Sequence, residues 1–279
     1  MIWKKYLLTK VLITTGIVGI FATPQITDKL VYKGDTISVY LNLLPKEFYK
    51  PKVKSAFDTH LAVNLFGNKK ACVQSSCWDG YQTMWEIVEN QLYLTGIYSC
   101  CFYKDSIKAD LTSLFKGKVI KGKVKADWVT KAIVRGGKGF ILWNRSNDMP
   151  VFAQEFEFVF FKGKLLYRMV FDNSKSREST YATNEMKLIK FIYSNIRWDK
   201  LPKQKEKIKV RLTFSANENG KIDDIELVRS ADKIFNQEAI RVIKSIPDWN
   251  VIYQKGQHCR QWFSMSIVFS EENRKEYRK

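Results

Sequence analysis

The stretch from Ile208 to Phe269 constrains the fold more than any other, because strand and helix periodicities follow one another in it within about sixty residues. Two alternating apolar–polar runs come first, then a helix-like run closed by Ile246-Pro-Asp-Trp249, then a third alternating run. In order, the runs are Ile208–Phe214, Ile222–Val228, Asn236–Lys244 and Trp262–Phe269. Asn219-Gly220 allows positive φ angles, so the first two strands can form a tight hairpin. The sequence predicts a short antiparallel sheet with one helix packed on it.

The first half of the chain is rich in strand patterns. Met84–Val88 and Gln91–Tyr98 flank a polar break at Glu89-Asn90, which predicts a β-hairpin. Further strands are expected at Thr36–Leu41, Val124–Val129, Phe140–Trp143, Ala153–Phe161 and Leu165–Phe171, with a hairpin turn at Lys162-Gly-Lys164. A helix over Ile107–Phe115, capped by Asp105 or Ser106, and a turn at Arg135–Gly139 complete the expected elements. These patterns predict a β-rich domain over residues 28–172.

A polar, serine-rich segment at residues 173–183 follows this domain. It contains Asn173-Ser-Lys-Ser-Arg-Glu-Ser-Thr180 and no apolar anchor, which indicates a linker. Apolar residues at helical spacing then predict a helix over Asn184–Tyr193. The second domain is expected over residues 184–270, before a basic tail at residues 271–279. The predicted fold class is α+β, with a β-rich amino-terminal domain and a small carboxyl-terminal domain.

Residues 1–23 have the features of an export signal. Lys4, Lys5 and Lys10 precede the apolar run Val11–Ala22, which is shorter than the roughly 20 residues of a membrane span. Two interpretations stay open: a cleaved signal peptide, or a retained anchor extended through Tyr6-Leu-Leu8. Both place the rest of the chain outside the inner membrane, in the periplasm or anchored so as to face it.

The composition is strongly basic, with 47 Lys and Arg against 28 Asp and Glu and a net charge of +19. Such a balance suits nucleic acid, anionic lipid or an acidic partner. The lysines are scattered, apart from a cluster over Lys200–Lys209 that we interpret as a polar connector. We therefore interpret the charge as a solvated basic surface and expect no nucleic-acid partner.

The cysteines bear on the compartment. A disulfide from Cys72 or Cys77 to Cys100 or Cys101 is expected if the compartment is oxidising, and the odd total of 5 leaves at least one thiol free. A zinc site is the alternative, but the adjacent Cys100-Cys101 pair lacks the usual ligand spacing and has no histidine beside it. We expect no metal site.

No catalytic constellation is visible in the sequence. His60 and His258 lie far apart, and neither Asp110 nor Asp127 has a neighbour that marks an acid–base pair. Glu86 would point outward from its strand. We expect neither enzymatic activity nor a cofactor. An enzyme with its site in the amino-terminal domain is a competing hypothesis that one sequence leaves open.

Two segments carry recognisable family patterns. In the first, Trp85-Glu-Ile, Leu92-Tyr-Leu, Leu111–Phe115 and Ala126-Asp-Trp128 make residues 75–165 resemble a domain of uncharacterised function in Bacteroidetes-type proteins. This resemblance implies a structural unit and no chemistry. The pieces of the second pattern are Phe191–Ile196, Val210–Phe214, Asn219–Ile225, Glu238–Lys244, Ile246-Pro-Asp-Trp249, Gly256 and Ser266–Phe269.

In order and spacing, this second set resembles the TonB carboxyl-terminal domain family over residues 184–269. One departure is Ile196-Arg-Trp198, because the related Bacteroidetes domains usually carry a proline after the first helix. The resemblance implies a module that binds a partner segment by strand addition, which requires few invariant side chains. The contact edge is expected to be the last strand, namely Trp262, Phe263, Ser264, Met265, Ser266, Ile267 and Val268.

The implied partner is an envelope protein such as an outer-membrane transporter, and a homodimer through the last strand is the other reading of this edge. A TonB-type energy transducer is the alternative function. The sequence favours it less, since there are only 6 prolines with no proline-rich stretch to cross the periplasm, and residues 1–23 lack the histidine of a transducer's span. We therefore expect an envelope protein-interaction protein.

Overall fold

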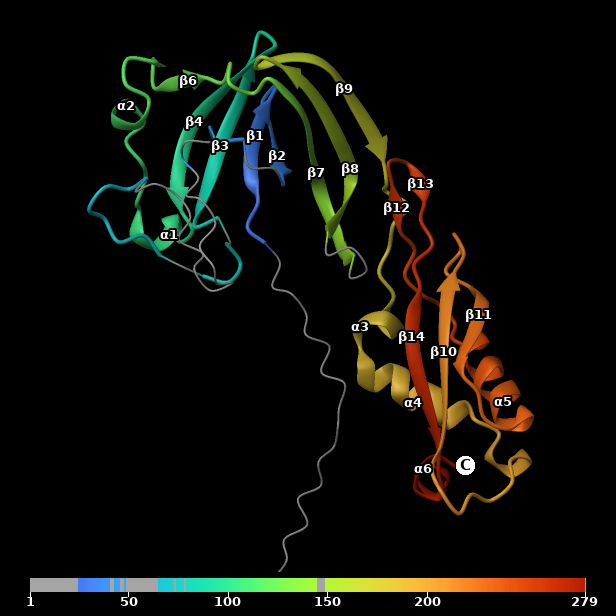
Figure 1. Cartoon of the computed structure of the whole chain (residues 1–279). Helices are drawn as coiled ribbons and strands as arrows, with labels where there is room; N and C mark the ends of the chain where they lie inside the picture. The colour runs from blue at the N-terminus through green and yellow to red at the C-terminus, as the bar shows by residue number, and fades with distance from the viewer. Residues whose placement is uncertain are drawn as a thin grey trace, which may run out of the picture.

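The computed structural model describes residues 25–40, 43–45, 48, 65–72, 74–77, 79–144 and 149–278. The expected leader at residues 1–23 and His60 lie outside these residues. The fold is α+β, as the sequence predicts, with a strand-rich amino-terminal domain and a smaller carboxyl-terminal domain (Figure 1). In the described part of the chain, no helix is both long and apolar enough to span a membrane.

One nine-stranded sheet forms the amino-terminal domain, in the order β3-β1-β2-β7-β8-β9-β4-β6-β5. Its strands are β1 (Asp28–Tyr32), β2 (Asp35–Val39), β3 (Tyr81–Val88), β4 (Gln91–Ser99), β5 (Val119–Ile120), β6 (Lys123–Lys125), β7 (Lys131–Asn144), β8 (Met149–Phe161) and β9 (Lys164–Asp172). The predicted hairpins β3–β4 and β8–β9 are confirmed, with positive φ at Glu89, Asn90, Lys162 and Gly163. Because β3 also pairs with β4, the strands from β3 round to β4 form a ring.

The ring closes at one end only. Strand β9 pairs with β4 at Lys164 and Gln91, where the Leu165 N–H donates to the Asn90 carbonyl at 2.7 Å. Figure 1 shows β4 and β9 meeting at the top of the domain and diverging below. Aromatic side chains fill the interior: Trp85 and Phe158 are completely buried, and Phe158 meets the ring of Tyr32 at 5.4 Å. This burial of large apolar groups is the main stabilising contribution to the domain.

Strand β7 continues through Arg135–Gly139, where the sequence predicts a turn, so that prediction is wrong. The reason is the close approach of β2: a Cβ on Gly136 would lie 2.2 Å from the Ser38 carbonyl oxygen. Glycine at this position therefore lets β2 pair with β7, and does not mark a chain reversal.

The predicted helix over Ile107–Phe115 is also wrong. Two short helices occupy this region, α1 (Phe102–Asp105) and α2 (Leu111–Leu114). Ser106 has a positive φ of 53°, which ends α1, and Asp110 caps α2 by accepting the Thr112 N–H at 2.9 Å. Ser106 and Asp110 thus separate two short helices in a segment where the spacing of apolar residues alone predicts one continuous helix.

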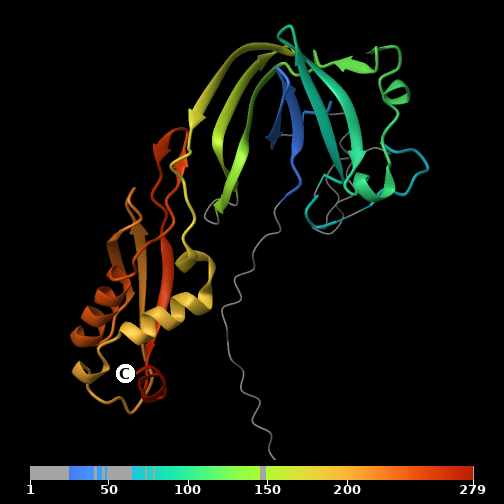
Figure 2. The same cartoon turned by 180° about the vertical axis from the view of Figure 1, so that it is seen from behind.

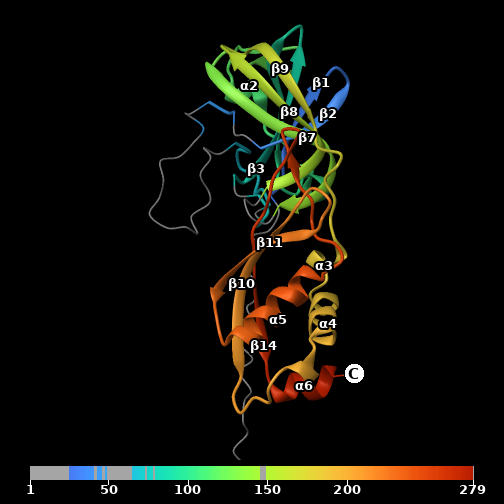
Figure 3. The same ribbon diagram turned by 90° about the vertical axis from the view of Figure 1, so that its right-hand side faces the viewer.

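The carboxyl-terminal domain follows the predicted strand–strand–helix–strand order. Its sheet has the order β11-β10-β14, from β10 (Ile208–Ala216), β11 (Ile222–Arg229) and β14 (Phe263–Phe269). The helices are α3 (Thr180–Thr183), α4 (Glu185–Asn195), α5 (Lys233–Lys244) and α6 (Glu271–Tyr277), with a 3-10 turn η2 (Trp198–Lys200). Figure 3 shows α4, α5 and α6 on one side of this sheet, and Figure 2 shows α4 running across the strand direction.

Two segments expected to lack structure are held in place. In the expected linker, Arg177 forms a bridge with Val251 and bonds Asp248 at 2.5 Å, and Ser179 caps α3. Most of the expected basic tail is helix α6, whose Arg274 is buried and donates to the carbonyls of Leu201 and Pro202. Hydrogen bonding to distant backbone, which local composition does not reveal, orders both segments.

A small hairpin joins the two domains. It consists of β12 (Tyr253–Gln254) and β13 (Gln257–His258), and its turn contacts β8. The Lys255 N–H donates to Glu155 at 2.9 Å, and the Lys255 ammonium lies 2.7 Å from Glu157. Ile252 packs with Leu142 and Val151 beside these bonds. The hairpin thus connects the amino-terminal sheet to the segment that leads into β14.

Candidate functional site

Strand β14 has two chemically different faces. Phe269 is completely buried against Trp198 and Phe235, with ring centroids at 6.0 and 5.2 Å, and Phe263 meets Trp249 at 5.2 Å. These contacts fix β14 on the helical layer. Ser264 points away from the core and is exposed. Trp262, at the entrance to the strand, is 46% exposed.

The hydrogen-bond ladder defines which groups of β14 face outward. Its register with β10 has no irregularity, and Val268 lies opposite Lys209. The Val268 N–H donates to the Tyr193 hydroxyl at 3.1 Å, and the Val268 carbonyl accepts from the Asn273 side-chain amide at 2.8 Å. Both backbone groups of Val268 therefore point away from β10. Because an antiparallel ladder alternates, those of Ser264 and Ser266 point the same way.

These outward groups form an open edge. Among the described residues, no hydrogen-bond partner is seen for the backbone N–H and C=O of Ser264 or Ser266. The Ser264 hydroxyl accepts from Arg211 on the exposed face of the sheet, at 3.0 Å. The edge is uncharged over its whole length from Phe263 to Phe269. It therefore has the properties of a surface to which another strand can add.

The opposite edge of the same sheet is different. Strand β11 carries Asp223, Asp224 and Glu226, and its pairing with β10 is irregular at two places. Charged side chains and bulges are the common means by which proteins prevent pairing at an edge. Asp223 is also held by Arg260 at 2.7 Å, and this ion pair lowers the pKa of Asp223. Of the two edges, β14 is the one free of these obstacles.

A buried carboxylate supports the domain from within. Glu238 of α5 is 3% exposed and accepts the Arg197 backbone N–H at 2.7 Å, while the guanidinium groups of Arg197 and Arg241 bind it at 2.7 Å each. Burial raises the pKa of Glu238, but the hydrogen bonds from Arg241 and Arg197 outweigh it and lower this pKa to about 2. Arg197 stands in Ile196-Arg-Trp198, where the sequence departs from the family pattern. This cluster was not predicted from the sequence, in which a Glu between apolar helix positions is its only signal.

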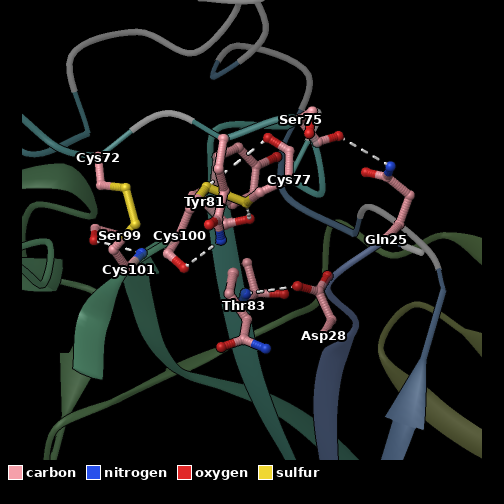
Figure 4. Close-up of a disulfide and its surroundings, with 12 residues drawn as sticks. Gln25, Asp28, Cys72, Ser75, Cys77, Tyr81, Thr83, Ser99, Cys100 and Cys101 are labelled. Carbon is pink, nitrogen blue, oxygen red and sulfur yellow. Dashed lines mark hydrogen bonds between the residues drawn. A yellow bond between two sulfur atoms is a disulfide. The ribbon is translucent and has the colours of Figure 1, made fainter. Parts of the chain in front are cut away.

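Cys72, Cys77, Cys100 and Cys101 lie together next to the start of α1. The structure pairs Cys72 with Cys101 and Cys77 with Cys100, so two neighbouring cysteines hold two points of the same loop (Figure 4). Cys259 is half-buried and is a free thiol. No group of His, Cys, Asp and Glu suited to a metal ion occurs among the described residues.

Beside the disulfides, Asp28 accepts the Thr83 N–H at 2.6 Å (Figure 4), and burial raises the pKa of Asp28 to about 7. Other acidic residues considered from the sequence have structural partners: Glu86 binds Lys123, and Asp110 caps α2. The ring of His258 lies 5.7 Å from that of Tyr253 in the small hairpin, tilted by 57°. These residues are dispersed over the fold, and the structure does not bring them together into one site.

The comparisons with known proteins point to the same domain as the edge geometry. No curated protein and no solved structure matches the chain. One family model does match, over residues 199–270, which contain β10, β11, α5 and β14. The recognised part of this chain is thus its carboxyl-terminal domain, whose match to the Gram-negative bacterial TonB protein C-terminal implies a periplasmic, envelope-associated role in protein contact.

Proposed function

We propose that this protein binds an extended segment of another envelope protein by adding it as a fourth strand beside β14. The observation that carries the proposal is the open edge at Ser264 and Ser266, where backbone donors and acceptors face outward without charge or bulge. Main-chain hydrogen bonds supply the affinity in this mode of recognition, so a conspicuous side-chain constellation is not needed.

The flanking residues favour a partner with apolar side chains. Trp262 and Met265 border the edge and are only partly buried, so they can cover alternate side chains of an added strand. The proposed partner is a periplasmic segment of an outer-membrane transporter or of another envelope protein. The match to the TonB C-terminal family supports this class of partner.

The compartment supports the same proposal. The pairs Cys72–Cys101 and Cys77–Cys100 suit an oxidising environment such as the periplasm. We further propose that residues 1–23 direct export, as a cleaved signal or as an anchor, and that residues 28–172 and 184–270 act as separate domains. The hairpin at Lys255 would then keep the β14 edge at a constant position relative to the amino-terminal sheet.

Site-specific photo-cross-linking in intact envelopes tests this function. A photoreactive residue in place of Ser264, in the full chain, is expected to capture an extended segment of an envelope protein. A second variant with the photoreactive residue in place of Glu226, on the β11 edge, is the matched control. Captured peptides identified by mass spectrometry give the partner sequence directly.

Proline substitutions then separate strand addition from simple proximity. Ser266→Pro removes an outward N–H of β14 and should abolish the cross-link, whereas Leu227→Pro removes an outward N–H of β11 and should leave it unchanged. Circular dichroism and thermal melting establish that both variants fold. Equal capture from both edges, or capture that survives Ser266→Pro, would refute the proposal. Cross-links between two copies of the chain would instead establish a homodimer through β14.

A further inference from the structure

The edge of β14 is open over only part of its length. Val268 follows the same alternation as Ser264 and Ser266, yet both of its outward backbone groups already have partners, Tyr193 of helix α4 and Asn273 of helix α6. We infer that Tyr193 and Asn273 form a latch that ends any docked strand beside Ser266. This inference rests on the proposed function, because it states where on β14 the partner can pair.

Tyr193, the first half of the latch, is held at both its ring and its backbone. Its hydroxyl accepts the Val268 N–H at 3.1 Å, and its ring lies 5.4 Å from that of Tyr277 on α6. The Tyr193 carbonyl also accepts from the Trp198 indole N–H at 3.0 Å, which fixes the end of α4. Since backbone and ring are both held, moving this hydroxyl away from β14 would disturb packing between α4 and α6.

Asn273 supplies the other half. Its side-chain amide donates to the Val268 carbonyl at 2.8 Å, while its backbone N–H donates to the Ser270 hydroxyl at 3.2 Å. Ser270 is buried at the junction of β14 and α6 and caps that helix. The same short turn therefore ends the strand, starts the helix and places Asn273 over the strand edge.

The latch has a direct consequence for the partner. An added strand could pair with Val268 only by displacing two existing hydrogen bonds, so pairing there would exchange bonds without a net gain. The partner's ladder should therefore use the backbone N–H and C=O groups of Ser264 and Ser266 and end there. Only two of the partner's backbone N–H groups are then needed, and a proline or a turn is tolerated at the position beside Val268.

Hydrogen exchange of the free full chain tests the latch without a ligand. The Val268 amide should exchange slowly and those of Ser264 and Ser266 rapidly. Tyr193→Phe should raise exchange at Val268 by about tenfold or more, because the phenyl ring packs alike but accepts no hydrogen bond. Tyr277→Phe is the matched control, since Tyr277 touches Tyr193 but is not bonded to β14. Unchanged exchange at Val268 in Tyr193→Phe would overturn the latch.

Peptide binding tests the consequence for the partner. The probes are synthetic peptides copied from the segment cross-linked at position 264, or tiled over periplasmic segments of outer-membrane transporters, each with single N-methylations. The wild-type chain should require two peptide N–H groups. The double variant Tyr193→Phe with Asn273→Ala should require three and bind about 3- to 10-fold more tightly.

The outcomes separate the two proposals. If peptides bind at β14 but the double variant shows the same affinity and the same two required N–H groups, the latch is refuted while strand addition stands. If no peptide binds and position 264 captures nothing, the docking function fails and this inference with it, even where Val268 remains protected.

Discussion

Replacing Glu238 by glutamine would test how the carboxyl-terminal domain is held together. Glu238 lies almost completely buried between Arg197, in the turn after α4, and Arg241, on its own helix. Glutamine has the same shape and keeps one acceptor oxygen, but it cannot compensate two guanidinium charges. The domain should therefore fold with the same structure and a lower free energy of unfolding.

The expected loss follows from the shift in protonation. Burial alone would raise the pKa of Glu238, yet its bonds to Arg241 and Arg197 lower it from 4.5 to about 2. A difference of about 2.5 pH units corresponds to about 3 kcal/mol at neutral pH. Because the folded pKa lies below the unfolded one, this contribution is complete above about pH 4.5 and is lost as the pH falls toward 2.

Urea unfolding followed by amide exchange in β10 would measure this domain separately from the other. The difference between wild type and Glu238→Gln should be about 3 kcal/mol at pH 7 and should shrink steadily below pH 4.5. Glu226→Gln, an exposed carboxylate of β11, is the control and should change stability by less than about 0.5 kcal/mol. A loss below about 1 kcal/mol at pH 7, or one independent of pH, would refute the reasoning.

Three further predictions concern the amino-terminal domain and the joint. Burial raises the pKa of Asp28 from 3.8 to about 7, so the wild-type chain should lose stability as the pH rises from about 4 to about 7; Asp28→Asn should be about 1–4 kcal/mol more stable at pH 8 and nearly equal at pH 4 in thermal melts. The double replacement Cys77→Ala and Cys100→Ala should cost about 3 kcal/mol in denaturant unfolding, since this bond spans 23 residues, and added reductant should then have a smaller effect than on wild type. Lys255 binds Glu157 across the domain joint, so Lys255→Gln should speed proteolysis of residues 173–179, while Arg135 stays paired with Glu157 and the melting of each domain changes little; unchanged cleavage would contradict that role.

Local patterns in the sequence were sufficient for the carboxyl-terminal sheet and helix. The runs at Ile208–Phe214, Ile222–Val228 and Trp262–Phe269 correspond to β10, β11 and β14, and the helix pattern corresponds to α5. These elements alternate or repeat with one buried face, which is the information that periodicity carries. Local patterns were misleading where contacts between distant backbone segments determine the structure. At Gly136, for example, the absence of a side chain allows strand β2 to approach, and the glycine does not form a turn.

The sequence by itself determined the α+β class and the order of elements around β14, and it suggested a disulfide from Cys72 or Cys77 to Cys100 or Cys101 without fixing it. Only the tertiary structure decided the parallel pairing of β1 with β3, the partner of each cysteine, and the burial of Glu238 between two arginines. The structure also distinguished the backbone N–H and C=O groups of Ser264 and Ser266, which face outward, from those of Val268, which are hydrogen-bonded to Tyr193 and Asn273. The physical reason is that these features depend on residues far apart in the chain, whereas periodicity reports only which face of a single element is buried.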